Sequence, residues 1–192
     1  MKTYLFLPAL ILLAGCGVLS PVTDSAVHHV LDPLVPYRSL TSATPSIAIN
    51  RPSIPGYLDR QQLVTRAKGQ LMISSIDLWG EPLETSIARV TASNLSRLTG
   101  SMNIQPVDNF TTLDYAHLLE MRIARFEPDD SGRMILEGTW KLQPVKGGES
   151  RSNFFSIAVP ISAGASPMWN RVDAMNQALE RLARQIAVGA GR

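Results

Sequence analysis

The chain has a single cysteine, Cys16, at the end of an uninterrupted apolar segment, "YLFLPALILLAG", over residues 4–15. A lone thiol allows no intrachain disulfide, so the folded part depends on its hydrophobic core. The apolar segment is shorter than the about 20 residues that a membrane-spanning helix needs. A lysine at position 2, a short apolar run and small residues before the cysteine are typical of a secretory signal peptide. We therefore expect the fold to begin after residue 16.

The residues Leu13-Ala14-Gly15-Cys16 resemble the lipobox of bacterial lipoproteins. The resemblance implies cleavage before Cys16, a thioether-linked diacylglyceryl group on its sulfur, and a third acyl chain, such as palmitate, on the new amino terminus. Two or three acyl chains make release from a membrane negligible. Gly17 stands where an Asp would favour retention in the inner membrane of enteric bacteria. The resemblance therefore implies a periplasm-facing anchor in the outer membrane of a Gram-negative bacterium.

These features predict three parts: a lipoprotein signal peptide over residues 1–15, a lipidated tether over 16–25, and a single domain over 26–192. The tether is polar and aperiodic, and about nine residues reach at most about 30 Å when extended. Lys plus Arg number 18 and Asp plus Glu 16, and no basic run occurs. This near-neutral balance argues against a nucleic-acid partner.

Local patterns in the domain predict strands first, then a helix, more strands and a final helix. Gly100 is the expected stop of the first helix, which opens at Pro82, and the apolar spacing predicts the second helix from Pro167 to Val188. Turn residues at Lys68-Gly69 and in "PDDSGR" predict two hairpins. The expected strands cover residues 26–31, 46–50, 62–67, 69–75, 121–127, 134–144 and 152–161. This order predicts an α+β fold in which two helices pack on one face of a mostly antiparallel sheet.

Motifs for catalysis or metal binding are absent from the sequence. His28 and His29 are adjacent, so in a strand they point to opposite faces, and His117 lacks the spacing of a metal-ligand pair. No serine lies in a nucleophile elbow, and Gly147-Gly148 lacks the residues of a phosphate loop. We expect no catalytic residue, no metal, and no cofactor other than the covalent lipid on Cys16.

Two stretches, residues 46–66 and 77–90, carry a more distinctive pattern. A short strand, a Pro-Gly-Tyr-Leu-Asp-Arg loop, Leu63-Val64-x-Arg66, and Trp79-x-Glu81-Pro82-Leu83 opening a helix together resemble the PqiC-type family. Members are lipoproteins described as auxiliary components of ABC-type transport systems. The lipobox and the final helix also fit, so the resemblance covers nearly the whole chain.

The resemblance implies a non-catalytic lipoprotein that works with an MCE-domain protein and an inner-membrane transport component. Such systems are similar to those that move phospholipids or other hydrophobic molecules between the two membranes. The lipoprotein would act as the docking element at the outer membrane.

The loop that begins with the Pro-Gly turn at residues 55–56 is the candidate partner contact. It carries Tyr57, Leu58, Asp59 and Arg60, and an exposed Tyr beside an Arg is typical of a contact surface. The alternative is that Tyr57 and Leu58 cover one end of the core while Asp59 and Arg60 form an ordinary surface pair.

Trp79, Glu81 and Pro82 favour a structural interpretation. A Trp at the junction of sheet and helix fills space, and a carboxylate near a helix start interacts favourably with its positive end. We expect these residues to form a structural junction.

Two other functions are compatible with the same anchor and domain. One is a structural or assembly lipoprotein for an outer-membrane β-barrel complex. The other is a periplasmic enzyme, which would require a pocket with converging polar groups. A single small domain cannot surround a transport path, so we also expect a homo-oligomer with rotational symmetry.

Overall fold

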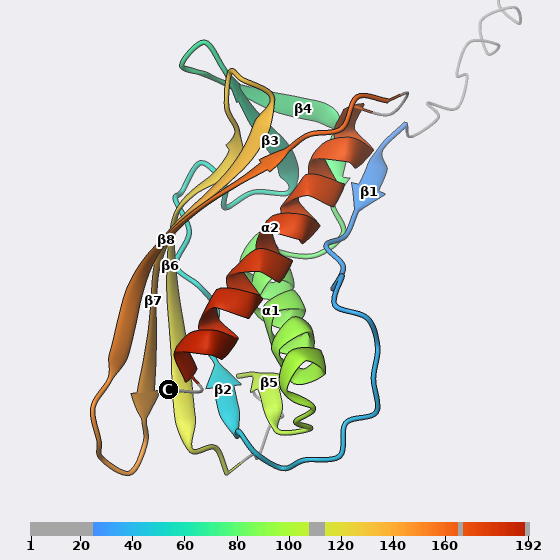
Figure 1. Cartoon of the computed structure of the whole chain (residues 1–192). Coiled ribbons are helices and arrows are strands. Elements are labelled where there is room, and N and C mark those ends of the chain that lie inside the picture. Colours follow the sequence, from blue (N-terminus) through green and yellow to red (C-terminus); the bar gives the residue numbers. More distant parts are fainter. Residues whose placement is uncertain (1–24, 108–113, 165–166, 191–192) are drawn as a thin grey trace, which may run out of the picture.

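The computed structural model describes residues 25–107, 114–164 and 167–190, so the expected signal peptide and nearly all of the tether lie outside it. Within these segments the chain forms eight strands and two helices arranged in two sheets (Figure 1). Their bounds are β1 Val27–His29, β2 Ile47–Ile49, β3 Gln62–Ala67, β4 Gln70–Trp79, α1 Leu83–Thr99, β5 Ile104–Pro106, β6 His117–Pro128, β7 Arg133–Pro144, β8 Arg151–Pro160 and α2 Pro167–Ala190.

The larger sheet has the order β5-β2-β6-β7-β8, and the two helices pack on one of its faces (Figure 1). β6, β7 and β8 form an antiparallel meander, whereas β2 runs parallel to both β5 and β6. The predicted α+β fold is confirmed, with a sheet that is mixed because β2 joins it in the parallel sense. The short β5 was not predicted, since three residues carry no measurable alternation.

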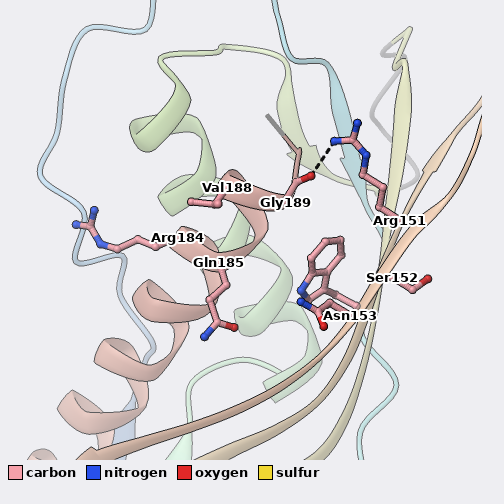
Figure 2. Close-up of a pocket in the computed structure, with 8 residues that line it drawn as sticks. Arg151, Ser152, Asn153, Arg184, Gln185, Val188 and Gly189 are labelled. Carbon is pink, nitrogen blue, oxygen red and sulfur yellow. Dashed lines mark hydrogen bonds between the residues drawn. The ribbon is translucent and has the colours of Figure 1, made fainter. Parts of the chain in front are cut away.

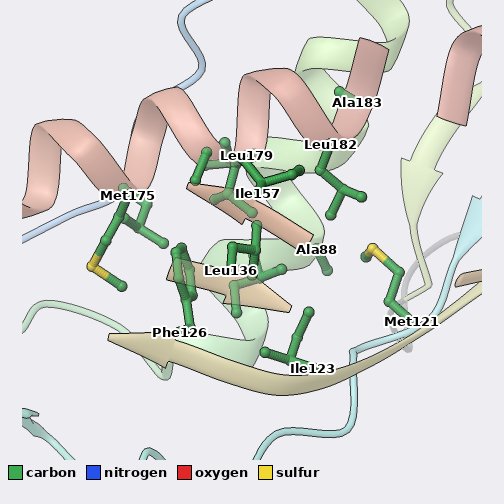
Figure 3. Packing of buried hydrophobic residues seen from close by; sticks show 14 of the residues in the cluster. Ala88, Met121, Ile123, Phe126, Leu136, Ile157, Met175, Leu179, Leu182 and Ala183 are labelled. Atoms are coloured by element: carbon green, nitrogen blue, oxygen red, sulfur yellow. The ribbon is translucent and has the colours of Figure 1, made fainter. Parts of the chain in front are cut away.

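The core lies between the helices and the larger sheet. Alternate side chains of the meander point inward, as the period of two requires. Figure 3 shows Ile123, Leu136 and Ile157 from its three strands beneath Leu179 of α2. The stripe predicted on the second helix is buried throughout, with exposed fractions of at most 6%: Val172, Met175, Leu179, Leu182 and Ile186.

Gly138 marks a place where β6 and β7 approach closely. The β6–β7 register shifts between Ile123 and Arg125, and Gly138 lies opposite Ile123. A Cβ atom on Gly138 would collide with the Arg122 carbonyl oxygen and would lie 2.8 Å from Cζ of Phe155. Only glycine fits the strand here without displacing its neighbours.

The smaller sheet has the order β1-β4-β3 and stands at one end of the molecule (Figure 1). β3 and β4 form the predicted hairpin, and Lys68 and Gly69 at its turn have φ values of 51° and 75°, in keeping with a tight hairpin turn. β1 adds to β4 in parallel, pairing Val27 with Asp77. The sheet expected from the sequence is therefore divided in two, a division that local periodicity does not reveal.

The predicted helix stop is also observed. Gly100 has a φ of 77°, and its N–H donates to the Ser96 carbonyl oxygen at 2.8 Å. A left-handed residue after the last helical turn caps the carbonyl groups that the helix leaves free, and glycine adopts this conformation at low cost.

Candidate functional site

The loop of residues 55–60 divides into a buried part and an exposed part. Leu58 is only 3% exposed and belongs to the core, and Tyr57 is half-buried. Asp59 and Arg60 are exposed. In the described structure no hydrogen bond or ion pair links the side chain of Asp59 to that of Arg60. Of the four residues predicted to contact a partner, Asp59 and Arg60 are those whose side chains extend into solvent.

Tyr57 is held by a buried carboxylate, Glu127, which the sequence did not single out. The Tyr57 hydroxyl donates to Glu127 Oε2 at 2.8 Å, and Nε of both Arg66 and Arg125 donates to Oε1 at 3.0 Å. The backbone N–H of Phe126 donates to Oε2 at 3.1 Å. Glu127 is fully buried, so the two guanidinium groups compensate a charge that would otherwise be costly inside the protein.

This Glu127 cluster, defined as Tyr57, Arg66, Arg125 and Glu127, joins the loop, β3 and β6. The Arg66 guanidinium also lies 5.6 Å from the centre of the Tyr57 ring. Burial, together with the hydrogen bond and the negative charge of Glu127, raises the pKa of the Tyr57 hydroxyl above its ordinary value. Tyr57 therefore stays protonated and remains a hydrogen-bond donor.

Both oxygens of the Glu127 carboxylate are occupied, and the group has no access to solvent. The cluster therefore fixes the loop against the strands. The strand that carries Glu127 also carries Glu120, Arg122 and Arg125, so no local signal marked Glu127 as buried.

The predicted junction lies where β4 passes into α1. Trp79 is the last residue of β4 and is 6% exposed. Its backbone N–H donates to the Gln61 carbonyl oxygen. Pro82 is the cap residue before the first turn of α1. The chain thus turns from sheet to helix around a buried indole.

Glu81 is bound by two side chains of α1. Ser86 Oγ donates to Glu81 Oε1 at 2.7 Å and Arg89 Nε donates to it at 3.0 Å. Burial opposes ionisation of Glu81, but the hydrogen bonds from Arg89 and Ser86 outweigh it and hold its pKa below the ordinary value. Arg89 also donates to the Leu31 carbonyl oxygen, so this pair ties the start of α1 to the segment after β1.

The loop and the junction, separate in the sequence, share one cleft of about 280 Å³. Its walls include Asp59 and Arg60 on one side and Trp79, Glu81 and Pro82 on the other. The structure thus brings together residues predicted as two separate features, because the backbone of Trp79 pairs with Gln61 directly after the loop.

A second cleft, of about 630 Å³, lies between the end of α2 and the strands β7 and β8 (Figure 2). Arg151 donates to the Gly189 carbonyl oxygen across it at 2.8 Å, and Arg184 is paired with Glu180. Trp140 lines the cleft, and its buried indole N–H has no hydrogen-bond partner among the described residues. The wall of the cleft therefore includes a buried donor that the described structure leaves unpaired.

Other candidate chemistry is accounted for by local contacts. His29 Nε2 lies 2.8 Å from an Asp77 carboxylate oxygen, whereas His28 is exposed. The part of the chain that the structure describes contains no group of three or more His, Cys, Asp or Glu residues placed to hold a metal ion. None of the described helices is long and apolar enough to cross a membrane.

The model of a family described as "ABC-type transport auxiliary lipoprotein component" matches residues 29–187. The chain belongs to this family. The match confirms the resemblance that residues 46–66 and 77–90 suggested, and it makes the protein an auxiliary component of a transport system. A search of curated proteins gave no match.

Two solved structures share the fold of this auxiliary-lipoprotein family member. An uncharacterised protein is 19% identical with a TM-score of 0.64, covering 83% of this chain and 97% of its own. Protein XCC0632 from Xanthomonas campestris, of the DUF330 family, is 18% identical with a TM-score of 0.60, covering 84% and 90%.

A weaker likeness is to the PelC dodecamer from Paraburkholderia phytofirmans. It is 10% identical with a TM-score of 0.44, and it covers 74% of this chain and 87% of that one. At this level the likeness says nothing about the assembly of the present chain.

Proposed function

We propose that the protein is a lipoprotein anchored by Cys16 in the outer membrane and facing the periplasm. In this proposal it serves as the docking component of an MCE-type intermembrane lipid transport system. The observation that carries the proposal is the family match over residues 29–187, which begins shortly after Cys16. The partners would be an MCE-domain protein and an inner-membrane transport component.

We propose no catalytic step and no cofactor other than the covalent lipid. The Glu127 carboxylate is fully buried, and each of its oxygens accepts two hydrogen bonds. Such a group cannot reach a substrate, so its role is structural.

The proposed contact with the partner is the rim of the small cleft, where Asp59 and Arg60 are exposed beside Trp79 and Glu81. A photoreactive amino acid at position 60 tests it in cells that express an MCE protein. The same probe at Thr139, an exposed position on β7, is the matched control. We expect an MCE-domain protein in the crosslinks from position 60 and none from position 139.

The same experiment distinguishes the alternative function. Recovery of an outer-membrane β-barrel protein in place of an MCE protein would support the assembly role. Consistent recovery of neither would remove the docking proposal.

The anchor and the assembly are tested separately. Cys16→Ala should abolish incorporation of labelled palmitate, and unchanged labelling would refute lipidation at this residue. We also propose that copies assemble into a symmetric homo-oligomer, because a single small domain cannot enclose a transport path. Native mass measurement of the detergent-solubilised lipoprotein would reveal a monomer if this is wrong.

A further inference from the structure

The hairpin strand β4 exposes a mostly apolar stretch that is interrupted by Ser74 and Ser75. Four of its side chains, Leu71, Met72, Ile73 and Ile76, have exposed fractions between 42% and 57%. No charged residue occurs from Gln70 to Ile76. Proteins usually protect protruding hairpins with charges, so an uncharged and exposed strand of this length indicates a surface that something covers.

Two neighbouring elements extend this surface. Val27 of β1 is 49% exposed and pairs with Asp77, directly after Ile76 in β4. At Met72 the surface borders a cleft of about 840 Å³ whose other walls are largely polar, with charged residues that include Arg66, Asp130 and Arg171. Trp169 in the first turn of α2, at the same end of the molecule, is 61% exposed but does not line this cleft. We define the apolar end as Val27, Leu71, Met72, Ile73, Ile76 and Trp169.

The chain outside the structure indicates what covers this end. The described residues begin at Ser25, two residues before β1, and Figure 1 shows β1 at the same end of the molecule as β4 and the start of α2. Cys16 is nine residues away, so an extended tether holds its sulfur within about 30 Å of Ser25. At about 3.3 Å per residue, the ten residues of β4 from its turn to Trp79 also span about 30 Å, so the reach of the tether matches the length of this strand.

We propose that the apolar end inserts its side chains into the lipid surface to which Cys16 is anchored. This inference rests on the proposed lipidation of Cys16. Apolar side chains together with a tryptophan suit the boundary between headgroups and acyl chains. The protein would thereby be held in a fixed orientation, with the far ends of the β6–β8 meander extending away from the membrane.

The depth of insertion is limited by polar groups on the same elements. Among the described residues, β4 from Gln70 to Ile76 pairs only with β3, so its other edge carries free backbone groups that need water. Lys68 at the hairpin turn is exposed, and its N–H donates to Asp130. The backbone therefore stays at the headgroup level while the side chains reach below it.

The single native cysteine makes the test direct. Once Cys16 carries lipid, Ile73→Cys supplies the only free thiol, which is labelled with the environment-sensitive dye NBD. The matched control is Gln143→Cys, at an exposed position near the opposite end of β7. Each full-length lipoprotein is reconstituted into vesicles of phosphatidylethanolamine and phosphatidylglycerol.

We expect a blue shift and a several-fold rise of NBD emission at position 73, quenched by lipids brominated on their acyl chains, and neither effect at position 143. Equal emission at the two positions on an acylated chain would overturn the inference. Shielding at position 73 that brominated lipids do not quench would also overturn it, because a second copy or another protein would then cover the surface.

The mass of each sample reports the acyl chains on Cys16. A chain that lacks them refutes the anchor, and the inference with it. A chain that carries them but shows no response at position 73 refutes the inference alone.

Discussion

The strands β4 and β8 are both ten residues long, but they place their apolar side chains differently. In β8, Phe155, Ile157 and Val159 alternate with exposed residues and are at most 4% exposed. In β4, Leu71, Met72 and Ile73 are consecutive, so they lie on both faces of the hairpin, and each is more than 40% exposed. β8 contributes to the core, whereas most side chains of β4 are exposed.

The largest expected difference comes from truncating one isoleucine in each strand. Ile157→Ala removes methyl groups from a side chain that is 4% exposed, and should lower the free energy of unfolding by about 2–5 kcal/mol. Ile73→Ala, at a side chain that is 51% exposed, should change it by about 0.5 kcal/mol or less. Urea denaturation of both variants measures the two values. Similar losses would show that the hairpin is part of the core and would break the comparison.

A glycine substitution tests how tightly the larger sheet is built. Gly138→Ala forces a Cβ atom against the Arg122 carbonyl oxygen and the Phe155 ring, and should cost about 1–3 kcal/mol of unfolding free energy. The control is Gly56→Ala, where an added Cβ meets no atom within 4 Å. The difference in thermal midpoint between the two variants is the measurement. A Gly138→Ala protein as stable as the control would contradict the close approach.

The Glu127 cluster joins β3, the hairpin partner of β4, to β6 of the larger sheet, and Glu127→Gln tests that connection. The variant keeps the shape but removes the charge that attracts Arg66 and Arg125. We expect a loss of about 1–2 kcal/mol, because both arginines are about one-third exposed and can be rehydrated.

Amide hydrogen exchange shows where the Glu127→Gln effect falls. Exchange should accelerate more in β3, which carries Arg66, than in β7. Glu137→Gln on β7 is the control, since Glu137 bonds only to Ser156 of the adjacent strand. Equal acceleration in the two strands would mean that the cluster does not hold the hairpin in place.

The smallest expected effect is a pH dependence at the seam between β1 and β4. Burial opposes ionisation of Asp77, but hydrogen bonds from His29 and Ser74 outweigh it and hold its pKa below the ordinary 3.8. A lowered pKa in the folded state stabilises the protein above about pH 3.8, and this contribution is lost as the pH falls through the folded pKa. Asp77→Asn should therefore be the less stable protein near neutral pH and approach the parent in acid.

Unfolding free energies of both proteins, measured from neutral pH to below pH 3.8, follow this convergence. A constant difference between Asp77→Asn and the parent at every pH would rule out the ionised carboxylate as its source.

The elements themselves could be predicted because their signals are local. The stripe from Val172 to Ile186 recurs at helical spacing, Gly100 stops a helix by its backbone freedom, and Lys68-Gly69 closes a hairpin between adjacent strands. The family could be identified from the order of such signals together with the loop and junction motifs. The lipid anchor at Cys16 is a prediction from the sequence and lies outside the described residues.

Contacts between distant segments depended on the tertiary structure. Leu58 and Tyr57 are neighbours of Asp59 and Arg60, yet the first is buried and the second is bonded to Glu127, 70 residues away. The alternation along β8 and the consecutive apolar residues of β4 are local patterns, and neither says which other element packs against the strand. Burial is decided by which surfaces meet when the chain closes, and residues far apart in the sequence carry no local mark of that meeting. For this reason the sequence alone determined the strands, the helices and the candidate loop, while the fold decided which of their side chains remain free to contact a membrane or a partner.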